Sequence, residues 1–184
     1  MTMDIRKKIV IPALVGAIYT VLTVLFAPIS YGFAQCRVSE LLCVLPFFLP
    51  GTAWGLFLGC ALANTVSLAG PLDIVFGSLA TLLAGLCTAR IGRAWRLGGG
   101  LPSLSARFLA CLMPVLFNGV IVGAVLAYTL AEGAFWPSYA FIGIQVAGGE
   151  AAALYALGLP LLTYVARRPT VLTFMERQKS GEVL

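Results

Sequence analysis

The 184-residue sequence has no histidine. Because imidazole is absent, a histidine general base, a histidine-activated nucleophile and a histidine metal ligand are all excluded. The sequence also lacks a Gly-rich phosphate loop with its lysine, and no acidic pair at helical spacing lies within an apolar stretch. We therefore expect no ATP site, no metal, no cofactor and no enzymatic activity.

Charge is scarce as well. Charged residues make up 10% of the chain and hydrophobic residues 60%, whereas soluble domains carry roughly 25% charged residues. A water-soluble fold cannot hide so much apolar surface, so we expect one membrane domain over residues 1–184. The cysteines lack the paired short spacings of metal sites and disulfide frameworks, and we interpret them as packing residues. They are Cys36, Cys43, Cys60, Cys87 and Cys111.

The first apolar stretch runs from Ile9 to Pro28, directly after Arg6, Lys7 and Lys8. A signal peptide has a similar charged start but a shorter apolar region. Since about 20 apolar residues are enough to cross a hydrocarbon core, we interpret this stretch as a retained transmembrane helix.

The second apolar stretch, Leu41 to Leu72, is ambiguous. As one helix it would be about 48 Å long, which is too long for a hydrocarbon core of about 30 Å. Pro46, Pro50 and Gly51 interrupt it near the middle, so it crosses the membrane either once with a kink or twice.

The positions of the basic residues decide between these alternatives, because cytoplasmic flanks carry the excess of Lys and Arg. All but one of the 12 basic residues lie in three clusters, and all three clusters face the cytoplasm only if Leu41 to Leu72 crosses twice. The clusters are residues 6–8; Arg90, Arg93, Arg96 and Arg107; and Arg167, Arg168, Arg177 and Lys179.

The sequence therefore predicts an all-α membrane protein with six transmembrane helices and both termini in the cytoplasm. We expect a cytoplasmic loop at 91–107 that lies against anionic lipid headgroups, and a C-terminal tail at 167–184. A nucleic-acid site is not expected. The predicted helices are 9–28, 38–50, 52–69, 73–90, 108–130 and 139–166.

Glu150 is the strongest candidate for a functional residue. It lies near the middle of the sixth predicted helix, where an ionisable group costs roughly 2.5–3.5 kcal/mol unless it has a partner or faces a polar cavity. Asn118, midway along the antiparallel fifth helix, is expected at a similar depth, although helix packing explains it equally well. Tyr139 falls on the Glu150 side of its helix, whereas Gln145 is rotated away.

Three charged residues lie at the predicted outer ends of helices. Arg37 and Glu40 are three residues apart, and this spacing fits either a local ion pair or a lid that closes onto a ligand. Asp73 fits either a helix cap or a ligand contact. Trp136 is typical of the aromatic belt at a membrane interface, and stacking on a ligand is the alternative.

Small residues at four-residue spacing mark faces where helices approach closely, either within the bundle or against a partner protein. They are Ala13 and Ala17 in the first predicted helix, and Gly55, Gly59 and Ala63 in the third.

Several segments between Ile11 and Arg167 together resemble one known family, the queuosine-precursor transporters. Asp73 to Thr81 is the most distinctive of them. The others are Val24 to Ser30, Arg37 to Glu40, Leu45 to Phe48, Gly59 to Asn64, Asn118 to Gly123, Gly149 with Glu150, and Leu157 to Pro160. The Arg-rich loop and the tail depart from the family pattern.

The resemblance implies the substrate-binding (S) component of an energy-coupling-factor transporter in a bacterial plasma membrane. Such a component binds a 7-deazaguanine precursor, such as the aminomethyl or cyano form, or queuine, on the outer side. It is thought to topple in the membrane to release its ligand. The implied partners are a transmembrane coupling subunit and two cytoplasmic ATPases. The faces at Ala13 and Ala17 and at Gly55, Gly59 and Ala63 are then expected to dock the coupling subunit.

The resemblance also suggests roles for individual side chains. Glu150 pairs with the ring N–H and the exocyclic amine, and Asn118 or Asn64 contacts the ring oxygen. Phe47 or Trp136 stacks on the ring, and Glu40 or Asp73 meets a cationic aminomethyl group. A different function remains open, namely a self-sufficient secondary transporter or channel in which Glu150 relays protons or ions.

Overall fold

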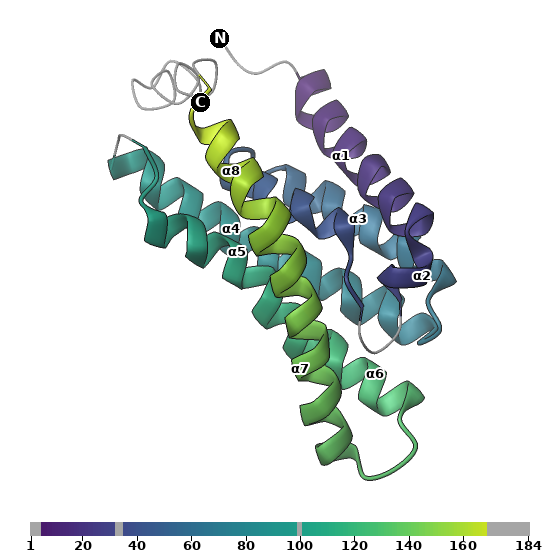
Figure 1. Cartoon of the computed structure of the whole chain (residues 1–184). Helices are drawn as coiled ribbons and strands as arrows, with labels where there is room; N and C mark the ends of the chain where they lie inside the picture. The colour runs from purple at the N-terminus through teal and green to yellow at the C-terminus, as the bar shows by residue number, and fades with distance from the viewer. Residues whose placement is uncertain (1–4, 32–34, 99–100, 169–184) are drawn as a thin grey trace.

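The computed structural model describes residues 5–31, 35–98 and 101–168, and within these ranges the chain forms helices and no strand (Figure 1). The predicted all-α fold is therefore confirmed. The tail beyond Arg168, with the basic residues Arg177 and Lys179, lies outside the described residues, as do Met1 to Asp4.

The chain folds as a bundle of α-helices that are joined or extended by shorter 3-10 and π-helical segments. The α-helices are α1 (Ile5–Leu25), α2 (Ala27–Ser30), α3 (Thr52–Ala63), α4 (Ser78–Gly98), α5 (Leu104–Phe117), α6 (Gly123–Leu130), α7 (Phe135–Ala153) and α8 (Leu159–Ala166). The 3-10 segments are η1 (Val38–Phe47) and η2 (Asn64–Val66), and the π-helical segments are η3 (Asp73–Gly77), η4 (Asn118–Val122) and η5 (Leu154–Gly158).

Three continuous helices of the described chain are long and apolar enough to cross a membrane. They are Asp73–Arg96, Leu104–Leu130 and Phe135–Ala166. Three shorter apolar helices precede them, Ile9–Leu25, Val38–Phe47 and Thr52–Val66. The order of these segments follows the six predicted helices, and a count of six membrane crossings stays a prediction.

The ends of the helices divide the bundle into two sides (Figure 1). The first turns of α1, the connection from α4 to α5 and the last turns of α8 lie at one end, and the turn between α6 and α7 lies at the opposite end. The predicted basic clusters of the described chain fall at the first end, in the last turns of α4, the first turn of α5 and the residues after α8.

The predicted loop at 91–107 is wrong in its length, because α4 continues to Gly98 and α5 begins at Leu104. Buried Trp95 stacks on Phe47, with 5.1 Å between the ring centroids, and Arg96 donates a hydrogen bond to the Phe47 carbonyl. These contacts hold the Arg-rich segment in a helix. The hydroxyl of Ser103 caps the start of α5 by accepting a hydrogen bond from the Ala106 N–H.

Two other predicted boundaries also shift. The segment predicted as helix 38–50 is a 3-10 helix that ends at Phe47. Pro46, which lies inside it, has no N–H to donate and favours an early end. The last apolar helix begins at Phe135 rather than at 139, because Pro137 falls in its first turn, where proline is tolerated.

The helices α1 and α3 pack backbone to backbone. A Cβ at Gly55 would collide with the Pro12 carbonyl, and a Cβ at Gly59 would collide with the Gly16 carbonyl. Thr20 reinforces this contact by donating a hydrogen bond of 2.9 Å to the Gly59 carbonyl. The small side chains of α3 are therefore used inside the bundle.

The expectation that Gly55, Gly59 and Ala63 dock a partner protein is contradicted by this packing, since all three are buried. Four-residue spacing of small residues indicates a close helix contact but does not specify which helix makes it. Ala13 and Ala17, in contrast, are exposed on the outward face of α1.

We expect Gly59→Ala to lower the free energy of unfolding by about 1–3 kcal/mol, because the new methyl group must push the α1 backbone away. Gly148→Ala in α7 is the matched control, since a Cβ at Gly148 meets no atom within 4 Å. Thermal unfolding in detergent should show a lower Tm for Gly59→Ala only. Equal Tm values for the two variants would contradict the observed α1 and α3 packing.

Candidate functional site

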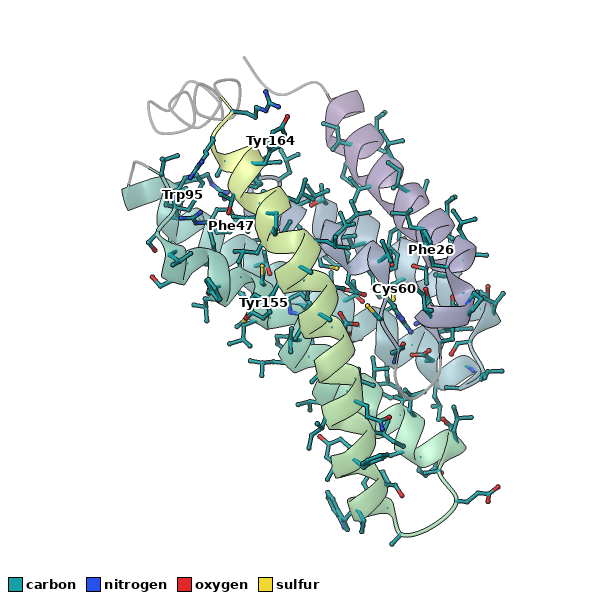
Figure 2. All side chains as sticks on the ribbon, viewed as in Figure 1. Phe26, Phe47, Cys60, Trp95, Tyr155 and Tyr164 are labelled. Carbon is teal, nitrogen blue, oxygen red and sulfur yellow. The ribbon has the colours of Figure 1, made fainter. Side chains whose placement is uncertain are left out.

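Polar side chains gather in the interior of this apolar bundle. Figure 2 shows nitrogen and oxygen atoms close to Cys60, whereas Phe47 and Trp95 lie toward the end of the bundle where α8 terminates. We refer to eight of the buried residues that carry polar groups as the polar cluster: Tyr19, Arg37, Glu40, Cys60, Asn64, Asp73, Asn118 and Glu150. Each of them is at most 3% exposed.

Arg37 is the basic residue of the polar cluster. It forms an ion pair with Asp73, with 3.7 Å between Nη2 and Oδ2, and its Nε donates to the Ser30 carbonyl at 3.1 Å and to Gln35 Oε1 at 3.0 Å. The alternative of a local ion pair between Arg37 and Glu40 is wrong. The backbone at Arg37 is extended before η1 begins, so its side chain points toward η3 instead of along its own helix.

Glu40 points from η1 into the bundle and is fully buried. Its carboxylate accepts two hydrogen bonds from neutral donors, one of 2.5 Å from the Tyr19 hydroxyl and one of 2.9 Å from the Cys43 thiol. Both oxygens of Glu40 are therefore satisfied within the protein. This pairing favours a structural role for Glu40 over direct contact with a ligand.

We expect Tyr19→Phe to lower the free energy of unfolding by about 1–3 kcal/mol, because one oxygen of a buried carboxylate loses its donor. Tyr128→Phe is the matched control, since the Tyr128 side chain is 72% exposed. Denaturation in detergent compares the two variants with the parent protein. If Tyr19→Phe is no less stable than Tyr128→Phe, the hydrogen bond to Glu40 does not stabilise the fold.

Asp73 and Asn64 meet where η2 and η3 pack together. Ser67 Oγ donates to Asp73 Oδ2 at 2.6 Å, and Asn64 Nδ2 donates to the Asp73 carbonyl at 2.9 Å. Asp73 does not cap its helix, because Leu72 occupies the cap position and no side-chain cap bond forms. Asp73 Oδ1 and the amide oxygen of Asn64 are buried without a hydrogen-bond partner among the described residues.

Glu150 of α7 and Asn118 of η4 lie side by side, as the antiparallel arrangement of their helices predicts. The Asn118 amide is close enough to act on the Glu150 carboxyl, and Arg37 and Glu40 are close enough to act on its charge. Glu150 Oε2 and Asn118 Nδ2 are both buried, and neither atom has a hydrogen-bond partner in the described chain. A free acceptor and a free donor therefore lie next to each other inside an apolar bundle.

The segment before η1 packs against α7 beside Glu150. A Cβ at Gly149 would collide with the Gln35 carbonyl, so the backbone of this segment touches the backbone of α7. Burial is the main cause that raises the pKa of the Cys36 thiol, and the nearby Glu150 carboxyl raises it further. Residues 35–37 therefore pack beside Glu150 at one edge of the polar cluster.

Two of the polar residues begin π-helical segments, Asp73 in η3 and Asn118 in η4. A third π-helical segment, η5, starts one turn after Glu150. Such wide turns are rare and occur frequently at functional sites. Sequence periodicity gave no sign of them, because one wide turn changes the register of the apolar residues only slightly.

Three predicted ligand contacts lie elsewhere. Phe47 is fully buried between Phe48 and Trp95 in a hydrophobic cluster, so its ring is already covered. Trp136 is 74% exposed at the start of α7, as expected of an interfacial belt residue. Tyr139 packs against Phe135 and lines an open apolar groove of about 630 Å³.

The described residues include no group of three or more His, Cys, Asp or Glu side chains that could hold a metal ion. The interactions that the polar cluster makes are hydrogen bonds and one ion pair. Such groups are costly in an apolar bundle, and they are retained where a polar solute or ion passes or binds.

An apolar helical bundle with unpaired polar atoms in its interior defines a membrane protein that handles a polar solute. A protein-family comparison agrees with this class, since the family described as the QueT transporter matches residues 9–167. The chain belongs to the QueT transporter family, which confirms the resemblance seen in the sequence. Comparisons with curated proteins and with solved structures found no match.

Proposed function

We propose that this protein is the S component of an energy-coupling-factor importer and that it captures a 7-deazaguanine precursor of queuosine in the polar cluster. The observation that supports this function is the pair of unpaired polar atoms, Glu150 Oε2 and Asn118 Nδ2, at one point of the interior. Four buried polar atoms of the polar cluster lack a partner among the described residues, and a bound polar ring would supply partners.

The donor and acceptor pattern fits the polar edge of a guanine-like ring. That edge carries an N–H and an exocyclic amine, which donate, and a carbonyl oxygen, which accepts. A carboxylate accepts two hydrogen bonds at once, so Glu150 pairs with the two donors. The Asn118 amide donates to the ring carbonyl. Buried polar groups left unpaired are costly, so the same two residues reject rings that lack this edge.

The import direction and the partners follow from the distribution of charge and small residues. We assign the Arg-rich end of the bundle to the cytoplasm of a bacterial cell, with both termini there and six membrane crossings. The polar cluster then lies toward the outer side, beneath residues 35–37. Ala13 and Ala17, exposed on α1, are assigned to the contact with the transmembrane coupling subunit.

Uptake measurements in reconstituted vesicles test the assignment as an S component. Labelled 7-deazaguanine is offered to vesicles that contain this chain alone, or this chain with a coupling subunit and two ATPases, with ATP or with a proton gradient. We expect uptake only in the complete assembly with ATP. An ATPase variant that cannot hydrolyse ATP serves as the matched control.

The same measurement tests the second candidate function, a secondary transporter in which Glu150 relays a proton. That function is favoured by the burial of Glu150 in a long apolar helix without an ion-pair partner in the described chain. Uptake by this chain alone, driven by the proton gradient, would replace the S-component assignment with this alternative.

A further inference from the structure

A groove of about 670 Å³ lies along α8 at the Arg-rich end of the bundle. Figure 2 shows one of its residues, Tyr164, near the point where α8 terminates. The lining residues form two neighbouring rows at four-residue spacing, so they share one face of the helix. They are Leu159, Pro160, Thr163, Tyr164, Arg167 and Arg168. None of these residues belongs to the polar cluster, and the proposed function does not use them.

The lining of this groove changes from apolar to charged toward the end of α8. Leu159 and Pro160 form its apolar end, Thr163 and Tyr164 follow one turn later, and the two arginines come directly after the helix. From Leu159 to the first arginine the helix rises about 12 Å. The headgroup layer on each side of a bilayer is only about 5–8 Å thick. With the arginines at the depth of the headgroups, Leu159 therefore lies at the depth of the lipid chains.

Three guanidinium groups surround the charged end of the groove. Arg167 is exposed in the lining, and Arg168 lies over the ring of Tyr164, with 4.0 Å between Cζ and the ring centroid. Arg107, at the start of α5, donates a hydrogen bond of 3.0 Å from Nη1 to Thr163 Oγ1. Two of the three arginines are therefore held in place by side chains that line the groove.

No acidic side chain of the described residues compensates these charges. Three of the four described acids, Glu40, Asp73 and Glu150, belong to the polar cluster. The fourth, Glu132, lies in the turn between α6 and α7 at the opposite end of the bundle (Figure 1). The C-terminal end of a helix carries about half a negative charge, which the three guanidinium groups exceed. The groove is therefore electropositive at one end and apolar at the other.

We propose that the groove binds an anionic phospholipid from the leaflet at the Arg-rich end of the bundle. The lipid phosphate lies at the arginines, because a guanidinium group binds phosphate oxygens through two parallel hydrogen bonds. The first part of an acyl chain lies against Leu159 and Pro160, where it covers apolar surface. A soluble anion would leave this apolar end uncovered, and a zwitterionic lipid would bring its own cation to the arginines. An anionic phospholipid matches both ends of the groove.

Native mass spectrometry of the detergent-purified full chain, titrated with phosphatidylglycerol or with phosphatidylcholine of the same acyl chains, tests this lipid site. We expect phosphatidylglycerol to bind about 10- to 30-fold more tightly, the ratio that two arginines near an anionic headgroup give. The double variant Arg167→Gln with Arg168→Gln should lower this ratio to less than about threefold. Arg90→Gln with Arg93→Gln is the matched control, since it removes the same charge from exposed positions of α4 at the same end of the bundle. The control should keep the ratio of the parent protein.

Equal binding of the two lipids by the parent protein would overturn the lipid site, even if a variant does not fold. Equal loss of preference in the two double variants would mean that the basic end attracts anionic lipid without using the groove. Glycerol phosphate, a headgroup without acyl chains, should not compete with phosphatidylglycerol, and competition at equal concentration would make the groove a site for soluble anions. A dimer that only Arg167→Gln with Arg168→Gln disrupts would assign the groove to a second copy of the chain.

Discussion

Glu150→Gln is expected to weaken the binding of a 7-deazaguanine by about 10- to 100-fold, as measured by titration of the purified protein. The substitution keeps the size of the side chain but replaces one acceptor oxygen with an NH2 donor. The guanine-like edge presents two donors to this position, so the new NH2 group faces a donor and one hydrogen bond is lost.

The control for this prediction is Gln145→Ala, which removes a polar side chain from the same helix and should change the affinity by less than about threefold. The folded fraction of Glu150→Gln should not fall, because the substitution removes an ionisable group from an apolar interior. Unchanged affinity in a folded Glu150→Gln protein would remove Glu150 from the ligand site.

The second large effect is on stability. Arg37→Met is expected to cost about 3–5 kcal/mol of unfolding free energy, because it leaves Asp73 buried without its cation. Met keeps much of the apolar length of the arginine side chain, so the loss is mainly electrostatic. Thermal unfolding in detergent, together with the yield of monodisperse protein, measures the effect.

The double variant Arg37→Met with Asp73→Asn separates this cause from lost packing. Since it removes both charges of the ion pair, it should recover a large part of the stability that Arg37→Met loses. Equal instability of the single and double variants would mean that the guanidinium stabilises the fold through Ser30 and Gln35, its other hydrogen-bond partners.

The sequence was sufficient to predict the class of fold and the most unusual residue. Glu150 is a predicted site residue because an ionisable group is rare in a long apolar helix. Asn118 is one because antiparallel neighbouring helices put the two residues at one depth. The structure brings them together. Both predictions depended only on chain direction and residue spacing, which the sequence contains.

The partners of the other polar residues could not be predicted, because they depend on contacts between distant segments. Arg37 lies three residues from Glu40, but it pairs with Asp73, which belongs to η3. Glu40 is instead bonded by Tyr19 of α1. Residue spacing within one helix predicts only pairs of neighbouring residues. The observed pairs depend instead on how α1, η1 and η3 pack together.

The sequence predicts that some helices make close contacts, but it does not predict which neighbour each of these helices contacts. Small residues at Gly55 and Gly59 do mark a tight contact, and the neighbour is α1 of the same chain. Sequence spacing is the same for a contact within the bundle and for a contact with another subunit. Only exposure separates the two, and it assigns Ala13 and Ala17 to the outside of the bundle.

Equilibrium binding by the detergent-purified chain alone, titrated with 7-deazaguanines and with adenine, tests the central claim most directly. We expect saturable binding of at least one 7-deazaguanine, without any coupling subunit, and much weaker binding of adenine, which lacks the ring N–H and the carbonyl oxygen of the guanine-like edge. Binding of no deazaguanine, or equal binding of adenine, would contradict the assignment of the polar cluster as a site for queuosine precursors.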